Sequence, residues 1–469
     1  MPRIRRHFRR PCRLPPQTAV AGLLLSALLL SACGQGEPHA KPRFPFLNSY
    51  AAKTSGAPVL LTNTEWWQGF DDPLLDHLIT LALTDNLSIA AARDRIVAAR
   101  ASARMLGSPF TLSPSVGAQI SDDGTSTDTE AMGSLGLSWM LDPYGKRRAE
   151  MDAAGARIEA ADAEAEAARL LVLYNLSNAY VDLRYYQRLL DLRREETVSR
   201  RRTLTLADTL LQASDGTRLE VTRARARLSD VETQIPMLEA RVQMQMNQIA
   251  VLTGRSPGTL GADLSKGRGQ PQATLSPEVG IPADLLRNRP DIRVAEQLYY
   301  AAVAEVAVSK ASLYPRLSLS GAITLSSING AKAGRSSYFG PTLTLPPLPG
   351  DSARAMVDQR RTAASLALTG WKSTVLEAIL EVENALLSYQ ASSRARAAAD
   401  RSLRLYREAQ DMVAELIDSG EATIESLIDA DQSVTNAANT VAESRRQQGL
   451  DFIALNVRLG SGSKAAPLN

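Results

Sequence analysis

Residues 146–213 limit the possible folds of this chain more than any other stretch. They contain no proline and one glycine, and leucines recur every seven residues at Leu176, Leu183 and Leu190. A 3.5-residue period is typical of a left-handed coiled coil. At 1.5 Å per residue, the stretch predicts a helical rod on the order of 100 Å long. Residues 352–418 repeat this pattern, so the sequence predicts a second rod.

The second rod is part of a duplication of most of the chain. The motif LDPYG at 141–145 recurs in weakened form as LPPLPG at 345–350, and each copy precedes an Ala-rich helical stretch. Further weak matches follow in the same order at an offset of about 200 residues. We therefore divide the chain into two repeats, 65–275 and 276–460, and a tail, 461–469.

Each repeat is expected to contain a helix, two strands and a long helical hairpin. The hairpins cover about 146–253 and 352–457. Pro236 should interrupt or kink the return helix of the first hairpin, because proline lacks a backbone N–H and clashes within a helix.

Four segments with a two-residue period precede the rods. Apolar residues alternate with small uncharged ones over about 112–122, 130–141, 316–327 and 337–346. Either a soluble half-buried sheet or a transmembrane barrel fits this pattern. Trp139, Tyr338 and Phe339 lie near strand ends, as in the aromatic girdles of membrane barrels. They favour the membrane interpretation.

Four strands cannot close a membrane barrel. An open edge would leave backbone N–H and C=O groups unpaired in hydrocarbon, which costs several kcal/mol for each group. Because known membrane barrels have at least about 8 strands, a dimer is the smallest solution and a trimer supplies about 12 strands. The strand pattern does not choose between these two.

The N-terminus has the layout of a secretory signal peptide. Residues 1–18 carry six arginines and no acid, and residues 19–32 are apolar or small. The segment Leu30-Ser31-Ala32-Cys33-Gly34 resembles a bacterial lipobox, although an ordinary signal peptide followed by a chance cysteine is the alternative. We expect removal of 1–32, attachment of diacylglycerol and an N-acyl chain to Cys33, and a lipidated linker over 33–64.

Charge and composition exclude two classes of function. Six of the 53 basic residues lie in 1–32, so a chain beginning at Cys33 carries 47 basic and 50 acidic residues, a net charge of −3. This leaves no basic footprint for nucleic acid. The three histidines, two cysteines and dispersed carboxylates form no metal-ligand, phosphate-loop or nucleophile motif. We therefore expect neither an enzyme nor a cofactor-binding protein.

Three motifs identify a family. Glu65-Trp66-Trp67, the junction SWMLDPYGKRR at 138–148 and IPADLLRNRPDIRVAE at 281–296 resemble outer-membrane factor lipoproteins that serve resistance-nodulation-division (RND) pumps. The resemblance covers nearly all of the chain after Cys33. Within the last motif, Arg289-Pro290-Asp291 is expected to cap and orient a helix. Residues 347–352 depart from the family because they lack its aromatic and basic residues.

The resemblance implies a mainly α protomer with four transmembrane β-strands. Three protomers would form a 12-strand β-barrel in the outer membrane, continuous with a 12-helix periplasmic α-barrel. The implied partners are outer-membrane lipid, a periplasmic membrane-fusion (adaptor) protein and an RND-type inner-membrane pump. The implied function is a passive conduit for drugs or other small molecules. A duct for secreted protein and a periplasmic coiled-coil adaptor or scaffold lipoprotein are the alternatives.

A conduit of this kind must close at rest, and we expect closure where the helical hairpins turn back. Acidic and basic side chains flank both turns and could form a ring or link neighbouring hairpins. The candidate gate residues are Asp208, Asp215, Arg218, Asp418 and Glu421.

Overall fold

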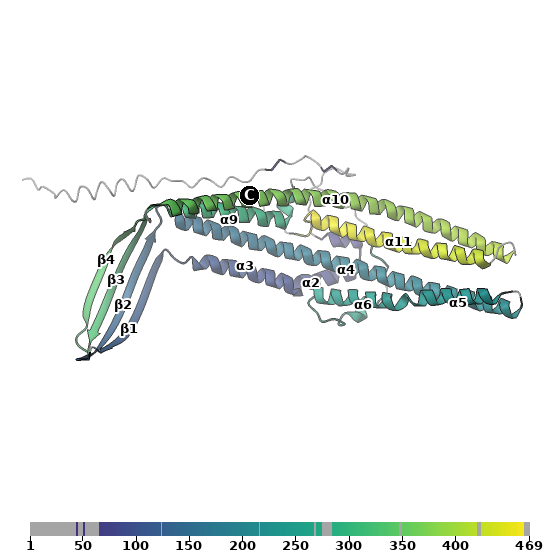
Figure 1. The fold of residues 1–469 in the computed structure, drawn as a ribbon, viewed down its shortest axis with the longest axis horizontal. Coiled ribbons are helices and arrows are strands. Elements are labelled where there is room, and N and C mark those ends of the chain that lie inside the picture. The colour runs from purple at the N-terminus through teal and green to yellow at the C-terminus, as the bar shows by residue number, and fades with distance from the viewer. Residues whose placement is uncertain are drawn as a thin grey trace, which may run out of the picture. The chain divides into compact units, whose positions relative to one another are not determined.

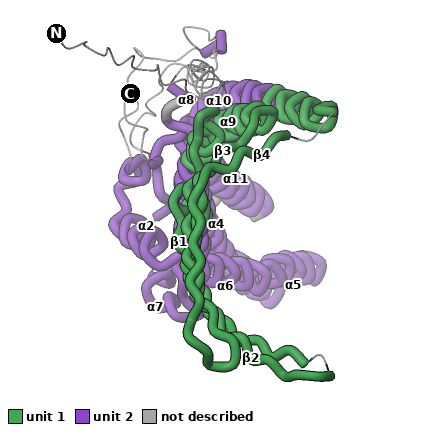
Figure 2. Tube along the Cα trace, turned by 90° about the vertical axis from the view of Figure 1, so that its left-hand side faces the viewer, with its two compact units in different colours: residues 1–42, 102–156, 299–366 green, residues 43–101, 157–298, 367–469 purple. Residues whose placement is uncertain are grey.

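The computed structural model describes most of the chain from Glu65 to Ser463. The described residues are 44–45, 50–51, 65–122, 124–214, 216–266, 269–273, 284–346, 349–419 and 424–463. The predicted signal segment and Cys33 lie outside them. The chain divides into two compact units (Figure 2). Among the described residues, the first unit holds those within 102–156 and 299–366, and the second holds those within 44–101, 157–298 and 367–463.

One antiparallel sheet occupies the first unit. Its strands lie in sequence order (Figure 1): β1 (Phe110–Asp122), β2 (Thr127–Leu141), β3 (Arg316–Ile328) and β4 (Gly334–Thr344). Strands β2 and β3, one from each repeat, pair from Glu130 opposite Ile328 to Leu141 opposite Leu317. The sheet therefore joins the two repeats.

Strand β2 begins at Thr127, three residues before the position expected from the sequence. Its added residues Thr127, Asp128 and Thr129 pair with the end of β1 although none of them is apolar. Backbone pairing extends the strand where the side-chain pattern has already ended.

Two very long helices match the predicted rods. Helix α4 (Lys146–Gln212) has 67 residues and α10 (Asp351–Asp418) has 68. Leu176, Leu183 and Leu190 are buried on α4, whereas Leu211, which lies three heptads after Leu190 on the same register, is exposed. The leucine seam is therefore buried in the middle of α4 and becomes exposed towards the turn.

The return helices of the two hairpins differ. In the first hairpin, α5 (Arg218–Glu232) ends and α6 (Ile235–Leu252) begins with Pro236 in its first turn. In the second hairpin, α11 (Ile424–Arg458) runs for 35 residues without interruption. The predicted effect of Pro236 is present, because proline is compatible with the first turn of a helix but not with its interior.

Shorter helices precede the strands. The N-terminal part of the second unit holds the 3-10 helix η1 (Trp66–Phe70) and α2 (Pro73–Asp85), and α3 (Leu87–Met105) leads towards β1. Asp72 caps α2 by accepting a hydrogen bond from the Leu74 N–H at 3.0 Å. In the second repeat, α8 (Leu285–Asn288) and α9 (Pro290–Ala311) precede β3, and α7 (Gly261–Leu264) follows α6.

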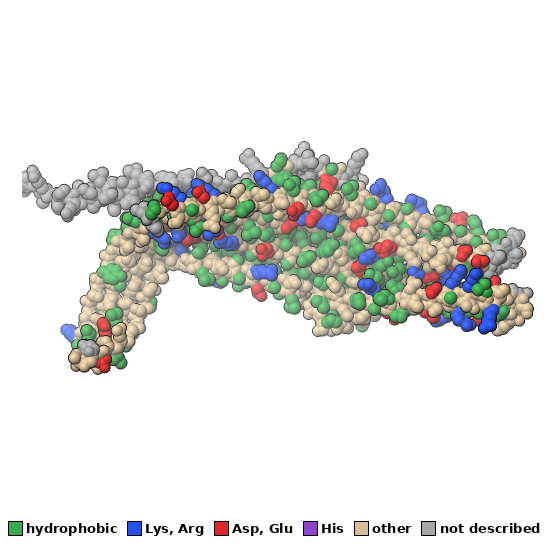
Figure 3. Space-filling model, in the orientation of Figure 1, with side chains coloured by type: hydrophobic (Ala, Val, Ile, Leu, Met, Phe, Trp, Pro, Cys, Tyr) green, Lys and Arg blue, Asp and Glu red, His purple; other side chains and the backbone are tan. Residues whose placement is uncertain are grey.

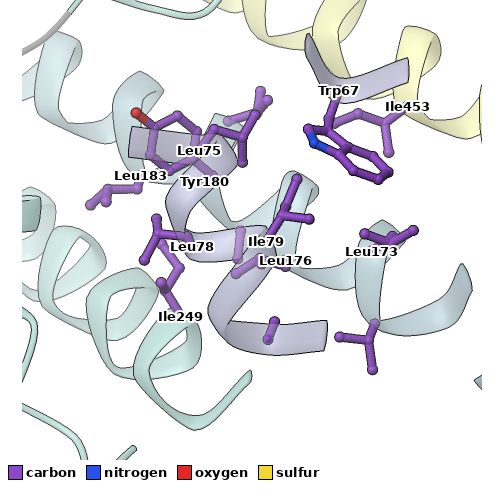
Figure 4. Packing of buried hydrophobic residues seen from close by; sticks show 14 of the residues in the cluster. Trp67, Leu75, Leu78, Ile79, Leu173, Leu176, Tyr180, Leu183, Ile249 and Ile453 are labelled. Atoms are coloured by element: carbon purple, nitrogen blue, oxygen red, sulfur yellow. The ribbon is translucent and has the colours of Figure 1, made fainter. Parts of the chain in front are cut away.

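The main hydrophobic core lies in the second unit, where η1 and α2 pack on α4, α6 and α11. Figure 4 shows Trp67, Leu75 and Ile79 together with residues of α4, among them Leu176. Burial of such side chains contributes roughly 1.5–3 kcal/mol each. The core attaches η1 and α2, together with the return helices α6 and α11, to the middle of α4.

Candidate functional site

The sheet has two chemically different faces. Side chains alternate along each strand, and directly paired residues share a face. One face carries mainly large apolar residues: Phe110, Leu112, Val116, Ile120, Leu135, Leu137, Trp139, Leu317, Leu319, Ile323, Leu325, Phe339 and Leu343. We call this the apolar face.

The opposite face is lined mainly by small hydroxyl residues, and we call it the polar face. Its members include Thr111, Ser113, Ser115, Ser134, Ser138, Ser318, Ser320, Thr324, Ser326, Thr342 and Thr344. Ser115 and Ser134 share a hydrogen bond of 2.7 Å across strands, which confirms that they lie on one face. A sheet of this kind can separate hydrocarbon from water.

Charged side chains are sparse on the strands. On the face shown in Figure 3, acidic and basic groups are scattered over the helices, whereas the sheet is nearly free of them between its two ends. The four strands contain five charged residues: Asp122, Asp128, Glu130, Arg316 and Arg335.

The structure describes only some of the candidate gate residues. Asp208 is half-buried on α4, and Arg218 is exposed as the first residue of α5. No ion pair joins these two described side chains. Asp215 and Glu421 lie outside the described residues, and Asp418 ends α10 with a side chain that is not described. Their role in gating stays a prediction.

The first turn is shaped by a capping box next to Arg218. The Thr217 N–H donates to the Glu220 carboxylate at 2.7 Å, and the Glu220 N–H donates to the Thr217 hydroxyl at 3.3 Å. These hydrogen bonds lower the pKa of the Glu220 carboxyl. Glu220 therefore has a local structural role at the start of α5.

A polar layer that sequence reasoning missed joins α4, α10 and α11. Asp431 accepts hydrogen bonds from Ser199 at 2.9 Å and from Gln410 at 2.6 Å. The next residues along α4 and α11 are also in contact, because Arg200 donates to Gln432. Arg200 also pairs with Glu196 of α4 at 3.3 Å. The layer connects the two hairpins within one chain.

Asp291 lies in the first turn of α9, as expected from the motif, and Arg289 in addition joins three elements. Its guanidinium forms two hydrogen bonds to Asp291 in the first turn of α9, at 3.0 and 2.6 Å. It also contacts Glu381 of α10 at 2.8 Å and donates to the carbonyl of Arg458, the last residue of α11, at 3.1 Å. The motif is therefore structural in this region.

A second buried arginine, Arg184 of α4, was not predicted. It donates to Gln187 and to the carbonyl groups of Leu264 and Lys266, and its guanidinium lies 5.0 Å from the centre of the Tyr180 ring. The Tyr180 hydroxyl donates in turn to Asp72. Burial, followed by this hydrogen bond, raises the pKa of Tyr180 well above its usual value.

The described His, Cys, Asp and Glu side chains form no group of three or more that could hold a metal ion. Within the same part of the chain, no helix is long and apolar enough to span a bilayer.

Comparison with known proteins gives concordant matches. The family model described as "Outer membrane efflux protein" matches residues 78–255 and 281–461. Nodulation protein T of Rhizobium leguminosarum bv. trifolii is 33% identical over 455 residues, which cover 93% of this chain and 96% of that protein. Outer membrane protein OprJ of Pseudomonas aeruginosa is 27% identical and covers 95% of this chain and 96% of its own length.

Solved structures show the same fold. The outer-membrane channel OprN has a TM-score of 0.80 and 28% identity, covering 90% of this chain and 98% of its own. The open state of the Neisseria gonorrhoeae MtrE outer membrane channel has a TM-score of 0.82 at 22% identity, covering 92% and 98%.

Proposed function

The chain belongs to the outer membrane efflux protein family, and from this premise we propose that three copies assemble into a passive duct that carries small molecules out of the periplasm. The observation that carries the proposal is a single two-faced sheet with two open edges. The polar face lines a water-filled passage, and the apolar face contacts lipid.

The open edges require more than one copy. Strands β1 and β4 are the edges of the sheet, and each is paired on one side only. In hydrocarbon, unpaired backbone groups cost several kcal/mol each. Pairing β1 of one copy with β4 of the next removes both edges. Pro114 in β1 and Pro341 in β4 are compatible with edge strands of the single chain, and each would leave one ladder hydrogen bond unmade in the closed barrel.

The duct performs no chemistry of its own. Solute moves along the hydroxyl-lined face, and the driving force comes from an inner-membrane pump of the RND type through a periplasmic adaptor. Support for these partners comes from relatives named as efflux or export proteins, including the pyoverdine export outer membrane protein OpmQ of P. aeruginosa and the toluene efflux pump protein TtgF of Pseudomonas putida.

The stoichiometry is tested on the mature protein in detergent. We expect a complex with the mass of three chains, measured by light scattering, that dissociates to a monomer on boiling. A stable, monodisperse monomer in a lipid bilayer contradicts the proposal.

The partners are tested by gentle solubilisation of native membranes and affinity capture of this chain. We expect an adaptor and a pump of the RND class to be captured together. A strain that lacks the chain should become sensitive to substrates of that pump. Normal resistance in that strain would show that the pump does not depend on this chain.

A further inference from the structure

The charges on the strands are not distributed evenly between the two faces. The pairing register places Asp128, Glu130 and Arg316 on the polar face, and Asp122 and Arg335 on the apolar face. Arg316 is the first residue of β3, whereas Asp128 and Glu130 lie at the start of β2, at the opposite end of the sheet. The polar face therefore carries one positive end and one negative end.

Arg316 is available to solute. Its side chain is exposed, and among the described residues it has no ion-pair partner. It lines a cavity of about 240 Å³ together with Thr111 and Ser138, which share its face. A free guanidinium at the edge of a cavity can bind a carboxylate, sulfonate or phosphate group.

The other cations at this cavity are engaged. The Lys146 ammonium pairs with Glu150 at 3.7 Å. Arg147 donates to the carbonyl groups of Leu106, at 3.0 Å, and Gly107, at the end of α3. Two carboxylates also line the cavity: Glu150 is paired with Lys146, and Asp142 accepts a hydrogen bond from the Arg148 N–H at 3.2 Å. Among the described side chains that line the cavity, Arg316 is therefore the cation left without an ion-pair or hydrogen-bond partner.

The negative end is held by a defined turn. The Asn329 side-chain amide donates to Asp128 at 2.7 Å, and its carbonyl accepts from the Thr129 N–H at 2.8 Å. Asn329 itself has a φ of 53°, the left-handed conformation that asparagine tolerates well. Asp128 is thus fixed beside Glu130 at the end of the polar face.

The two ends act independently in physiological salt. Glu130 lies opposite Ile328, so the length of β3 separates it from Arg316, roughly 40 Å along the strand. The Debye length is about 8 Å at physiological ionic strength, so neither charge is felt at the other end. Between them the described polar face carries no charged side chain.

We propose that Arg316 is a specificity-determining residue of the duct, which concentrates anionic organic solutes at the helix–strand junction. Asp128 and Glu130 favour cations at the other end. The inference rests on the proposed function, because three copies turn each residue into a ring around a water-filled passage.

The test places a thiol beside each charge. Ser318 and Ser326 both lie on the polar face of β3, near Arg316 and near Glu130 respectively. Variants Ser318→Cys and Ser326→Cys are treated with two methanethiosulfonates, one with a sulfonate and one with a trimethylammonium group. The parent protein gives the background, because Cys33 is the one cysteine expected after removal of residues 1–32 and its thiol is expected to be acylated.

We expect the ratio of sulfonate to ammonium rates to be higher at position 318 than at 326. Arg316→Gln should lower the ratio at 318 by about three- to tenfold, as expected for a charge within one Debye length, and leave 326 unchanged. Arg316→Lys should preserve the ratio, and about 1 M salt should abolish the difference. Glu130→Gln should raise the ratio at 326 alone.

An unchanged ratio at 318 in Arg316→Gln overturns the inference, and so does an equal change at both positions. If the proposed duct does not exist, the labelling pattern is different. In that case neither reagent reaches Ser318→Cys, whereas Leu319→Cys on the apolar face reacts.

Discussion

Replacement of Arg184 by alanine should loosen the core that joins the N-terminal helices to α4. Its side chain is 0% exposed, and it donates to Gln187 at 2.7 Å and to the carbonyl groups of Leu264 and Lys266 at 3.3 and 3.0 Å. It also donates to the Tyr180 hydroxyl at 3.2 Å. The guanidinium thus connects α4 with α7 and the segment after it.

Two costs follow from Arg184→Ala. The Lys266 carbonyl loses a part-buried hydrogen bond, which contributes about 0.5–1.5 kcal/mol. Truncation of a large buried side chain leaves a cavity, and such cavities cost about 2–5 kcal/mol. Relief of the desolvation of a buried charge offsets part of this sum. We therefore expect a net loss of about 3 kcal/mol in the free energy of unfolding of this region.

The matched control is Arg188→Ala, one turn further along α4. Arg188 is 40% exposed and pairs at 3.2 Å with Glu195, which is 64% exposed. Such an exposed pair contributes about 0–1 kcal/mol. The midpoint temperature of thermal unfolding in detergent, measured by circular dichroism, should fall by about 6–12 °C for Arg184→Ala, at ~2–4 °C per kcal/mol, and by about 0–4 °C for Arg188→Ala.

A second variant tests the hydrogen-bond network around Tyr180 without creating the cavity that Arg184→Ala leaves. Tyr180→Phe retains the ring below Arg184 but removes the hydroxyl that donates to Asp72. It should cost about 1–3 kcal/mol. Equal midpoints for Arg184→Ala and Arg188→Ala would refute the reasoning, because burial would then make no difference to the value of an arginine on this helix.

Three further predictions concern the anchor, the gate and a helix end. Cys33→Ser should abolish incorporation of a radiolabelled fatty acid, and retained label would exclude the lipobox. Arg218→Ala should raise single-channel conductance in planar bilayers and sensitise cells to large antibiotics, whereas unchanged conductance would place the gate elsewhere. Gly254→Ala should destabilise the fold by more than about 1 kcal/mol, since its φ is 73° and an added Cβ would lie 2.4 Å from the Asp85 carbonyl oxygen. Gly258→Ala is the control, because this glycine also has a positive φ, 89°, but an added Cβ would have no atom within 4 Å. Equal midpoint temperatures of thermal unfolding for the two variants would contradict the clash with Asp85.

The long helices and the strands could be predicted because each has a local period. A proline-free heptad series predicts α4, and a two-residue alternation predicts β3 within one residue of its observed end. The expected bounds of the fourth strand, 337–346, are less accurate, because β4 runs from Gly334 to Thr344. The position of Pro236 likewise predicts the break between α5 and α6, because it depends on one residue and its neighbours.

The polar contacts inside the bundle could not be predicted in the same way. Asp431 and Ser199 are 232 positions apart, and both look like ordinary surface residues of an amphipathic helix. Arg184 carries the same side chain as Arg188, and tertiary packing alone makes one buried and the other exposed. The sequence contains the residues of these contacts but no local signal of their partners.

The break between α5 and α6 makes the two hairpins mechanically unequal. The return arm of the first hairpin is interrupted at Thr233-Gln234, although both residues keep right-handed helical backbone angles. The return arm of the second hairpin is a continuous beam of 35 residues whose far end carries the buried residues Phe452, Ile453 and Leu455. Because Pro236 removes a backbone N–H at this break, we expect the first return arm to bend there more easily than the uninterrupted α11.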